Sequence, residues 1–151
     1  MDVGFEPHEI RTDEPTRSAR LKWVVIVDES LPPGRAANAV VCLGAATQAG
    51  VTGLLGPDAP DAQGSVHPGL PWAGCSILAA PAGRLAEIRA KASASAGVFV
   101  ADMPAAAQLT RVYDEYLQTM ADDAAPALYA VSLVGPRNRI DKIVGRLPLL
   151  P

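Results

Sequence analysis

A continuous apolar run at residues 23–27, Trp-Val-Val-Ile-Val, constrains the fold more than any other feature of the sequence. The run is rich in β-branched residues and does not alternate with polar ones, so both faces of the strand that it predicts must be covered. Such a strand lies inside a sheet that has helices on its two sides. We therefore expect a buried strand at residues 21–28, followed by a helix that begins near Arg35 and ends at Gly50.

The rest of the chain repeats the alternation of strand and helix. Strands are predicted at residues 75–80, 97–102 and 128–134, and a short one at 54–55; helices are predicted at 81–95, 104–121 and from 136 onward. Asp102 stands two positions before Pro104, an arrangement that predicts an N-cap for the helix at 104–121. This order predicts a single three-layer α/β domain over residues 21–151, and it leaves the order of the strands open.

Residues 1–20 differ from the remainder in composition. They are polar, contain five acids and three bases, and show little periodicity. We expect them to form a flexible N-terminal arm or a segment draped over the surface. The whole chain has a net charge of −3, which lacks the basic excess typical of nucleic-acid-binding proteins and argues against a nucleic-acid partner.

The two cysteines, Cys42 and Cys75, are too few and too far apart for a disulfide framework or a metal clamp. Free thiols in a reducing compartment are the simplest interpretation. No signal peptide or membrane-spanning run is recognisable, so we expect a soluble cytoplasmic protein with no membrane partner. No cofactor motif is present, and we predict neither a cofactor nor a metal site.

Candidate site residues gather around the first predicted strand and its helix. The carboxyl ends of strands in an open α/β sheet are where ligands bind, and backbone amides at a helix N-terminus can hold an anion. Asn38 and Cys42 share one helix face because they are four residues apart. The ligand-binding candidates are Asp28, Glu29, Ser30, Gly34, Arg35 and Asn38, and the catalytic candidates are Cys42, Asp102 and His67. Each of them also has a structural interpretation, in a turn, a helix cap or the packed core.

Several short motifs follow one another along the chain. They are Leu31-Pro-Pro-Gly34 and Ala37-Asn38-Ala39 after Asp28, Gly53-Leu-Leu-Gly56, Asp61-x-x-Gly64 with His67-Pro-Gly69, and residues 90–102. In this order they resemble the motifs of the domain-of-unknown-function 2000 (DUF2000) family. That family is similar in fold to type II peptidyl-tRNA hydrolases, a link that the closing segment Gly135-Pro136 and Ile140–Gly145 supports. The resemblance implies a small mixed β-sheet with helices on both faces, as a homodimer.

The hydrolase activity does not carry over with the resemblance. Those enzymes have a lysine in the loop after the first strand, a Gly-Lys pair and a helical histidine, where this chain has Pro32-Pro33, Gly34-Arg35 and Cys42. Three hypotheses remain: a domain that binds a small molecule or a peptide on a hydrolase-like scaffold without the parent catalysis, a hydrolase of unknown substrate that uses Cys42 or Asp102 with His67, and a weak RNA-binding protein. The RNA-binding hypothesis would use four bases of the last helix region, Arg137, Arg139, Lys142 and Arg146.

Overall fold

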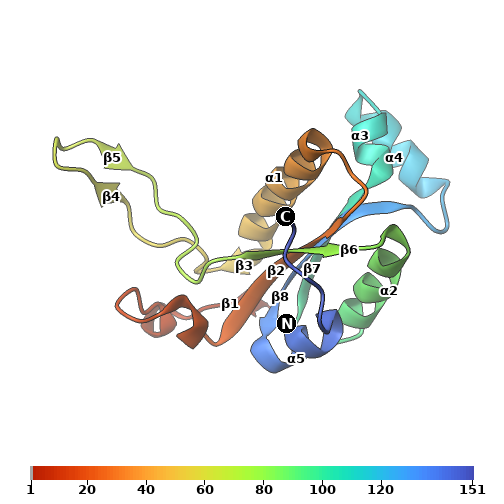
Figure 1. The fold of residues 1–151 in the computed structure, drawn as a ribbon. Helices are drawn as coiled ribbons and strands as arrows, with labels where there is room; N and C mark the ends of the chain where they lie inside the picture. The colour runs from red at the N-terminus through yellow and green to blue at the C-terminus, as the bar shows by residue number, and fades with distance from the viewer. Residues whose placement is uncertain (1) are drawn as a thin grey trace.

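Strand β2 (Leu21–Asp28) is an inner strand of a four-stranded sheet in the computed structural model, which describes residues 2–151 (Figure 1). The strand order is β6–β2–β8–β7, with β6 at Ser76–Ala80, β8 at Leu128–Pro136 and β7 at Phe99–Pro104. β6 is parallel to β2, whereas β8 is antiparallel to both β2 and β7. The sheet is therefore mixed, and the prediction of one α/β domain is confirmed.

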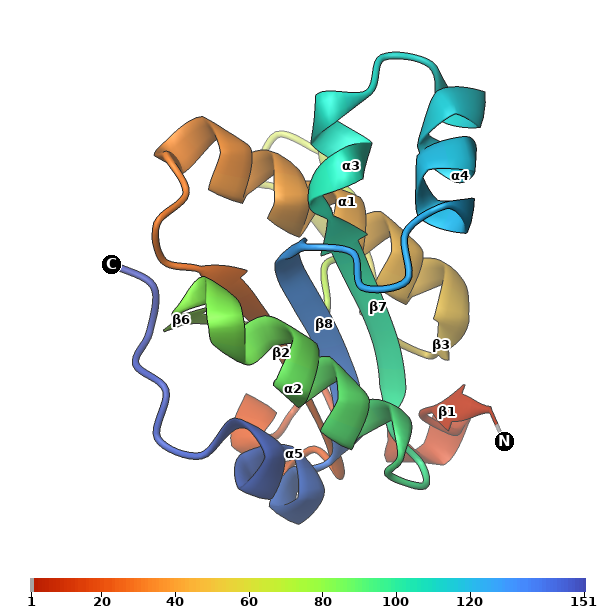
Figure 2. The same ribbon diagram turned by 90° about the vertical axis from the view of Figure 1, so that its right-hand side faces the viewer.

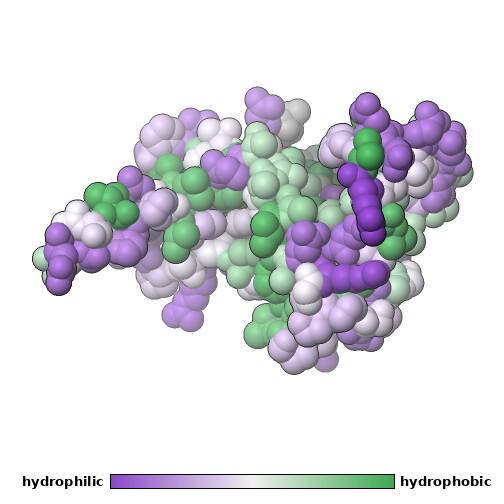
Figure 3. Space-filling view, turned by 90° about the horizontal axis from the view of Figure 1, so that it is seen from above, coloured by the Kyte–Doolittle hydropathy of each residue, from purple (hydrophilic) through white to green (hydrophobic). Residues whose placement is uncertain are grey.

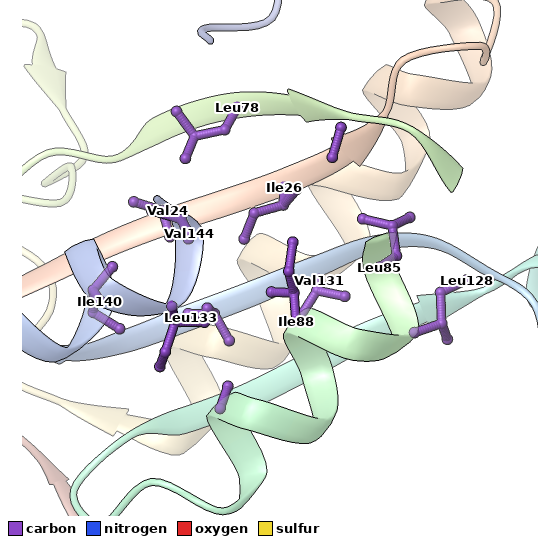
Figure 4. Close-up of a cluster of buried hydrophobic side chains, with 13 residues drawn as sticks. Val24, Ile26, Leu78, Leu85, Ile88, Leu128, Val131, Leu133, Ile140 and Val144 are labelled. Carbon is purple, nitrogen blue, oxygen red and sulfur yellow. The ribbon is translucent and has the colours of Figure 1, made fainter. Parts of the chain in front are cut away.

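Alternate residues of β2 are buried on opposite faces of the sheet, which explains its unbroken apolar run. Val24 and Ile26 pack under α2 (Ala82–Ser93) and α5 (Arg137–Val144), as Figure 4 shows. Val25 and Val27 pack under α1 (Pro33–Gly50) on the other face. Figure 2 shows α2 and α5 in front of the sheet with α1 behind it. The predicted helices on both faces are thus present.

Helix α1 packs on the sheet through a buried face that includes two alanines. Ala36 and Ala39 precede Leu43 and Thr47 on that face, at the three- and four-residue spacing of a helix. The helix begins at Pro33, whose fixed φ suits the first turn. It ends at Gly50, where any Cβ would collide with the ring of Phe99.

The single helix predicted at residues 104–121 is wrong. The structure has two short helices there, α3 (Ala105–Leu109) and α4 (Tyr113–Ala121), separated by an extended break. Thr110 is the C-cap of α3, with an extended backbone, and both its N–H and its Oγ1 donate hydrogen bonds to the carbonyl of Ala106. The predicted N-cap is also absent: Asp102 lies inside β7, and Pro104 precedes the first turn of α3.

The N-terminal segment runs along one end of the domain. β1 (Val3–Gly4) pairs in parallel with β3 (Val51–Thr52), and two short 3-10 helices, η1 (Pro7–Glu9) and η2 (Thr16–Ser18), follow β1. The side chain of Phe5 is 3% exposed, and its ring lies 4.7 Å from that of Trp72. Arg20 forms an ion pair with Glu9. The flexibility expected for this segment stays a prediction.

The Gly- and Pro-rich region after β3 forms a hairpin that projects from the domain (Figures 1 and 3). Its two strands, β4 (Ala59–Pro60) and β5 (Val66–His67), are antiparallel. At its base, Leu55 pairs with Pro71, and the indole of Trp72 donates to the carbonyl of Gly53. None of the helices within residues 2–151 has the length and apolar character needed to cross a membrane.

Candidate functional site

A cleft of about 630 Å³ lies between α1, the carboxyl end of β7 and the α3–α4 pair. Its walls come from four parts of the chain that the fold brings together. The lining residues are Asn38, Cys42, Ala45, Asp102, Met103, Pro104, Ala107, Thr110, Arg111, Val112, Tyr113 and Tyr116. Three of the predicted site residues, Asn38, Cys42 and Asp102, are therefore brought to one cleft.

Asn38 and Cys42 form the α1 wall, on the shared face that their spacing predicted. Cys42 Sγ lies 4.0 Å from Asn38 Oδ1, and both residues are exposed. Asn38 Oδ1 also accepts a hydrogen bond of 3.1 Å from Gln108 Nε2, which donates to the carbonyl of Arg35 as well. Gln108 thus ties α3 to α1. Sequence reasoning missed it, although a lone amide at the end of the Ala105–Ala107 run was a usable signal.

Asp102 lies in the wall of the cleft, but its carboxylate is directed to the other face of the sheet. The residue is paired with Val131, which belongs to the core under α2, while the neighbouring Met103 packs on the α1 side. Arg89 of α2 donates to the Asp102 carboxylate at 2.5 Å, and the Asp102 side chain is 17% exposed. This ion pair offsets the negative charge and separates it from Asn38 and Cys42.

The α4 wall supplies two phenol rings and one cation. Tyr113 and Tyr116 are in edge-to-face contact, with ring centroids 5.5 Å apart. Burial raises the pKa of the Tyr116 phenol, and the charge of Asp102 and the neighbouring Tyr113 raise it further. Arg111, in the break before α4, is exposed and forms no ion pair or side-chain hydrogen bond within residues 2–151.

The candidates at the end of β2 lie outside the cleft. Asp28 is 6% exposed, and its Oδ1 accepts hydrogen bonds from the backbone nitrogen and the hydroxyl of Ser30, at 2.9 and 2.7 Å. Glu29 is exposed, and its N–H donates to the carbonyl of Ala80. These contacts stabilise the turn after the strand, and they leave the Asp28 carboxylate little freedom to bind a ligand.

The start of α1 is also separate from the cleft lining. Gly34 lies in the first turn of α1, with open space where a Cβ would be. The Arg35 guanidinium donates to the hydroxyl of Tyr129 at 3.2 Å. Neither residue lines the cleft. Anion binding by the amides at the start of α1 stays a prediction.

His67 is not brought to the cleft. It lies on β5 of the projecting hairpin, where its Nε2 is 3.1 Å from Oδ2 of Asp61. The pKa of Asp61 is lowered by this hydrogen bond and by the backbone N–H groups of Gln63 and Ser65. Figure 1 shows the hairpin on the side of the molecule opposite to α3 and α4. The fold thus does not assemble the predicted combination of Cys42 or Asp102 with His67.

Comparisons with other proteins identify a family and a similar fold. The family model described as "Protein of unknown function (DUF2000)" matches residues 21–151, from the first residue of β2 onward. A solved structure of a protein of unknown function, Atu0240 from Agrobacterium tumefaciens strain C58, is similar with a TM-score of 0.79 and 17% identity. The similarity covers 86% of this chain and 97% of that one, and at this identity it shows the fold alone. No curated protein matches the sequence.

Proposed function

Since the chain belongs to the DUF2000 family, whose description assigns no activity, we propose a function from its own geometry: it is a binding domain whose small-molecule ligand occupies the cleft between α1 and α4. The observation that carries this proposal is the convergence of Asn38, Cys42, Arg111 and Tyr116 on one cleft. The volume of about 630 Å³ lies within the range of roughly 300–1,000 Å³ common for small-molecule sites.

The lining has the mixture of surfaces that ligand sites use. Apolar wall comes from Ala45, Met103, Pro104, Ala107 and Val112. A few polar groups interrupt that wall, and such groups orient a ligand. Within residues 2–151 the side chain of Asn38 forms hydrogen bonds through Oδ1 only, so its Nδ2 is available to donate to a ligand.

Hydrolysis has less support than binding. Cys42 provides a thiol, but no histidine or lysine is among the residues that line the cleft. A cysteine nucleophile requires a neighbouring base or positive charge, and Arg111 would be the only source of such charge. From the sequence resemblance, we also propose that the scaffold is similar to that of type II peptidyl-tRNA hydrolases and that the protein forms a homodimer.

RNA binding through the bases of the last helix region is also weakly supported. Arg137 donates to the carbonyls of Ala19 and Thr16, and Arg139 donates to the carbonyl of Ala96. These two guanidinium groups hold neighbouring segments of the chain in place. They are therefore less available for phosphate contacts, on which RNA affinity depends.

A fragment screen observed by ¹H–¹⁵N NMR, with two tryptophan variants, tests the proposed site. Ala45 is exposed and lines the cleft, whereas Ala46 is exposed on the same helix and does not. We expect fragments to shift the amide signals of cleft residues, Ala45→Trp to abolish these shifts by filling the cleft, and Ala46→Trp to preserve them. Shifts that persist in Ala45→Trp, or that scatter over other surfaces, would show that the ligand site is elsewhere.

A further inference from the structure

We infer that the ligand of this cleft is a small carboxylate with a planar apolar body, and that Arg111 binds its acid group. The inference rests on the proposed function and adds the chemical class of the ligand. It begins with the charges around the cleft. Arg111 and Asp102 are the two charged residues in the lining, and the Asp102 carboxylate is already paired with Arg89.

Arg111 differs from most arginines of this protein because its guanidinium has no partner within residues 2–151. Arg11, Arg20, Arg84 and Arg89 form ion pairs, and Arg35, Arg137 and Arg139 donate to a hydroxyl or to backbone carbonyls. Arg17 and Arg146 are also without a partner, but neither lines the cleft. A planar guanidinium can donate two parallel hydrogen bonds to one carboxylate. The ammonium group of a lysine does not match a carboxylate in this way.

The acids nearest to Arg111 in the sequence leave it available. Asp114 and Glu115 lie in the first turn of α4, are exposed, and form no ion pair with Arg111. Neither lines the cleft. Among the charged groups that line the cleft within residues 2–151, the Arg111 guanidinium is therefore the one without a partner.

The other groups of the cleft suit the remainder of such a ligand. Asn38 Nδ2 and the two tyrosine hydroxyls can donate hydrogen bonds to carboxylate oxygens. The edge-to-face pair of Tyr113 and Tyr116 offers ring surface to a planar group, and Pro104 and Val112 extend that apolar surface. An anion without an apolar part would leave this wall unused.

Benzoate and two matched probes, benzamide and benzylamine, test the inference by NMR titration of the cleft amides. Because a hydrogen bond to a charged group is stronger than a neutral one, we expect benzoate to bind about tenfold more tightly than benzamide, a difference of about 1.4 kcal/mol. Benzylamine should bind most weakly of the three. Arg111→Gln should remove the preference for benzoate, and Arg111→Lys should retain part of it.

Arg146→Gln is the control for net charge, since Arg146 is exposed, has no partner within residues 2–151 and lies away from the cleft. It should keep both the affinity for benzoate and the preference. Equal binding of benzamide, or a preference that survives in Arg111→Gln, would overturn the carboxylate inference while the binding site stands. If the fragment screen shifts cleft amides but none of the three probes does, the inference is again wrong. If neither the fragments of the screen nor the three probes shift the cleft amides, the proposed function itself is wrong.

Discussion

Ser132 is a buried hydroxyl in β8 that holds two other polar side chains. Trp23 Nε1 donates to Ser132 Oγ at 2.9 Å, and Thr47 Oγ1 lies 2.7 Å from the same oxygen. Ser132 and Thr47 are both 0% exposed. Removing one partner leaves buried polar groups unsatisfied, so we expect Ser132→Ala to lower the free energy of unfolding by about 2 kcal/mol, measured by urea denaturation. The double variant Thr47→Val/Ser132→Ala should lose less than the sum of the two single losses; simple additivity would contradict the network.

The phenol of Tyr116 reports on the position of Asp102 at the edge of the cleft. Burial is the main cause of its raised pKa, and the negative charge of Asp102 contributes because it opposes formation of the phenolate. Asp102→Asn should therefore lower the pKa of Tyr116 toward its usual value. An ultraviolet absorbance titration measures this, with Tyr116→Phe to identify the signal among the three tyrosines. An unchanged or higher pKa would mean that Asp102 is not close enough to act on Tyr116.

At the scale of elements, α4 differs from the helices that cover the sheet. None of its residues is fully buried, although Tyr116 is partly buried, and it packs mainly on α3, whereas α1, α2 and α5 each bury three or more side chains. Because helices with little buried surface open at low free-energy cost, we expect faster hydrogen–deuterium exchange in α4 than in α1 and α2. Mass spectrometry of the exchanged peptides measures the difference. If α4 were protected from exchange as strongly as α1, the expectation that α4 opens at low free-energy cost would be wrong.

Local sequence patterns were sufficient to predict the buried strand and the helix face that depend on residue spacing alone. The apolar run of β2 and the spacing of Asn38 and Cys42 on α1 follow from the periods of strands and helices. The break at Thr110 was not predictable, because the apolar spacing continues through it, whereas the backbone of Thr110 is extended and ends α3. The face to which Asp102 points is set by the register of β7 on β8, a tertiary contact.

The arrangement of the site residues also depends on tertiary contacts, which local sequence patterns do not show. The hairpin direction, which decides where His67 lies, is a tertiary property of the whole domain, and a sequence pattern does not encode it. Arg111 has no distinguishing neighbour in the sequence, and its role depends on the cleft that α1 and α4 form together. The family, by contrast, was predictable from ordered short motifs, and the family model confirms it.

For the whole molecule, Phe5 tests whether the N-terminal segment folds together with the domain. The Phe5 side chain is 3% exposed beside Trp72, and the segment lies outside the family match. If the segment is part of the cooperative fold, Phe5→Ala should lower the free energy of unfolding by about 3 kcal/mol, the lower end for a buried phenylalanine. Arg17→Ala, an exposed control in the same segment, should change it by less than about 0.5 kcal/mol. Equal, small effects would instead show a flexible arm that detaches independently.

A crystal structure of the protein soaked with benzoate tests most directly whether the cleft between α1 and α4 is the ligand site. We expect the benzoate ring beside Tyr113 and Tyr116, and its carboxylate at the guanidinium of Arg111. Benzoate bound at another surface, with the cleft empty at concentrations that saturate the NMR shifts, would contradict the cleft as the binding site.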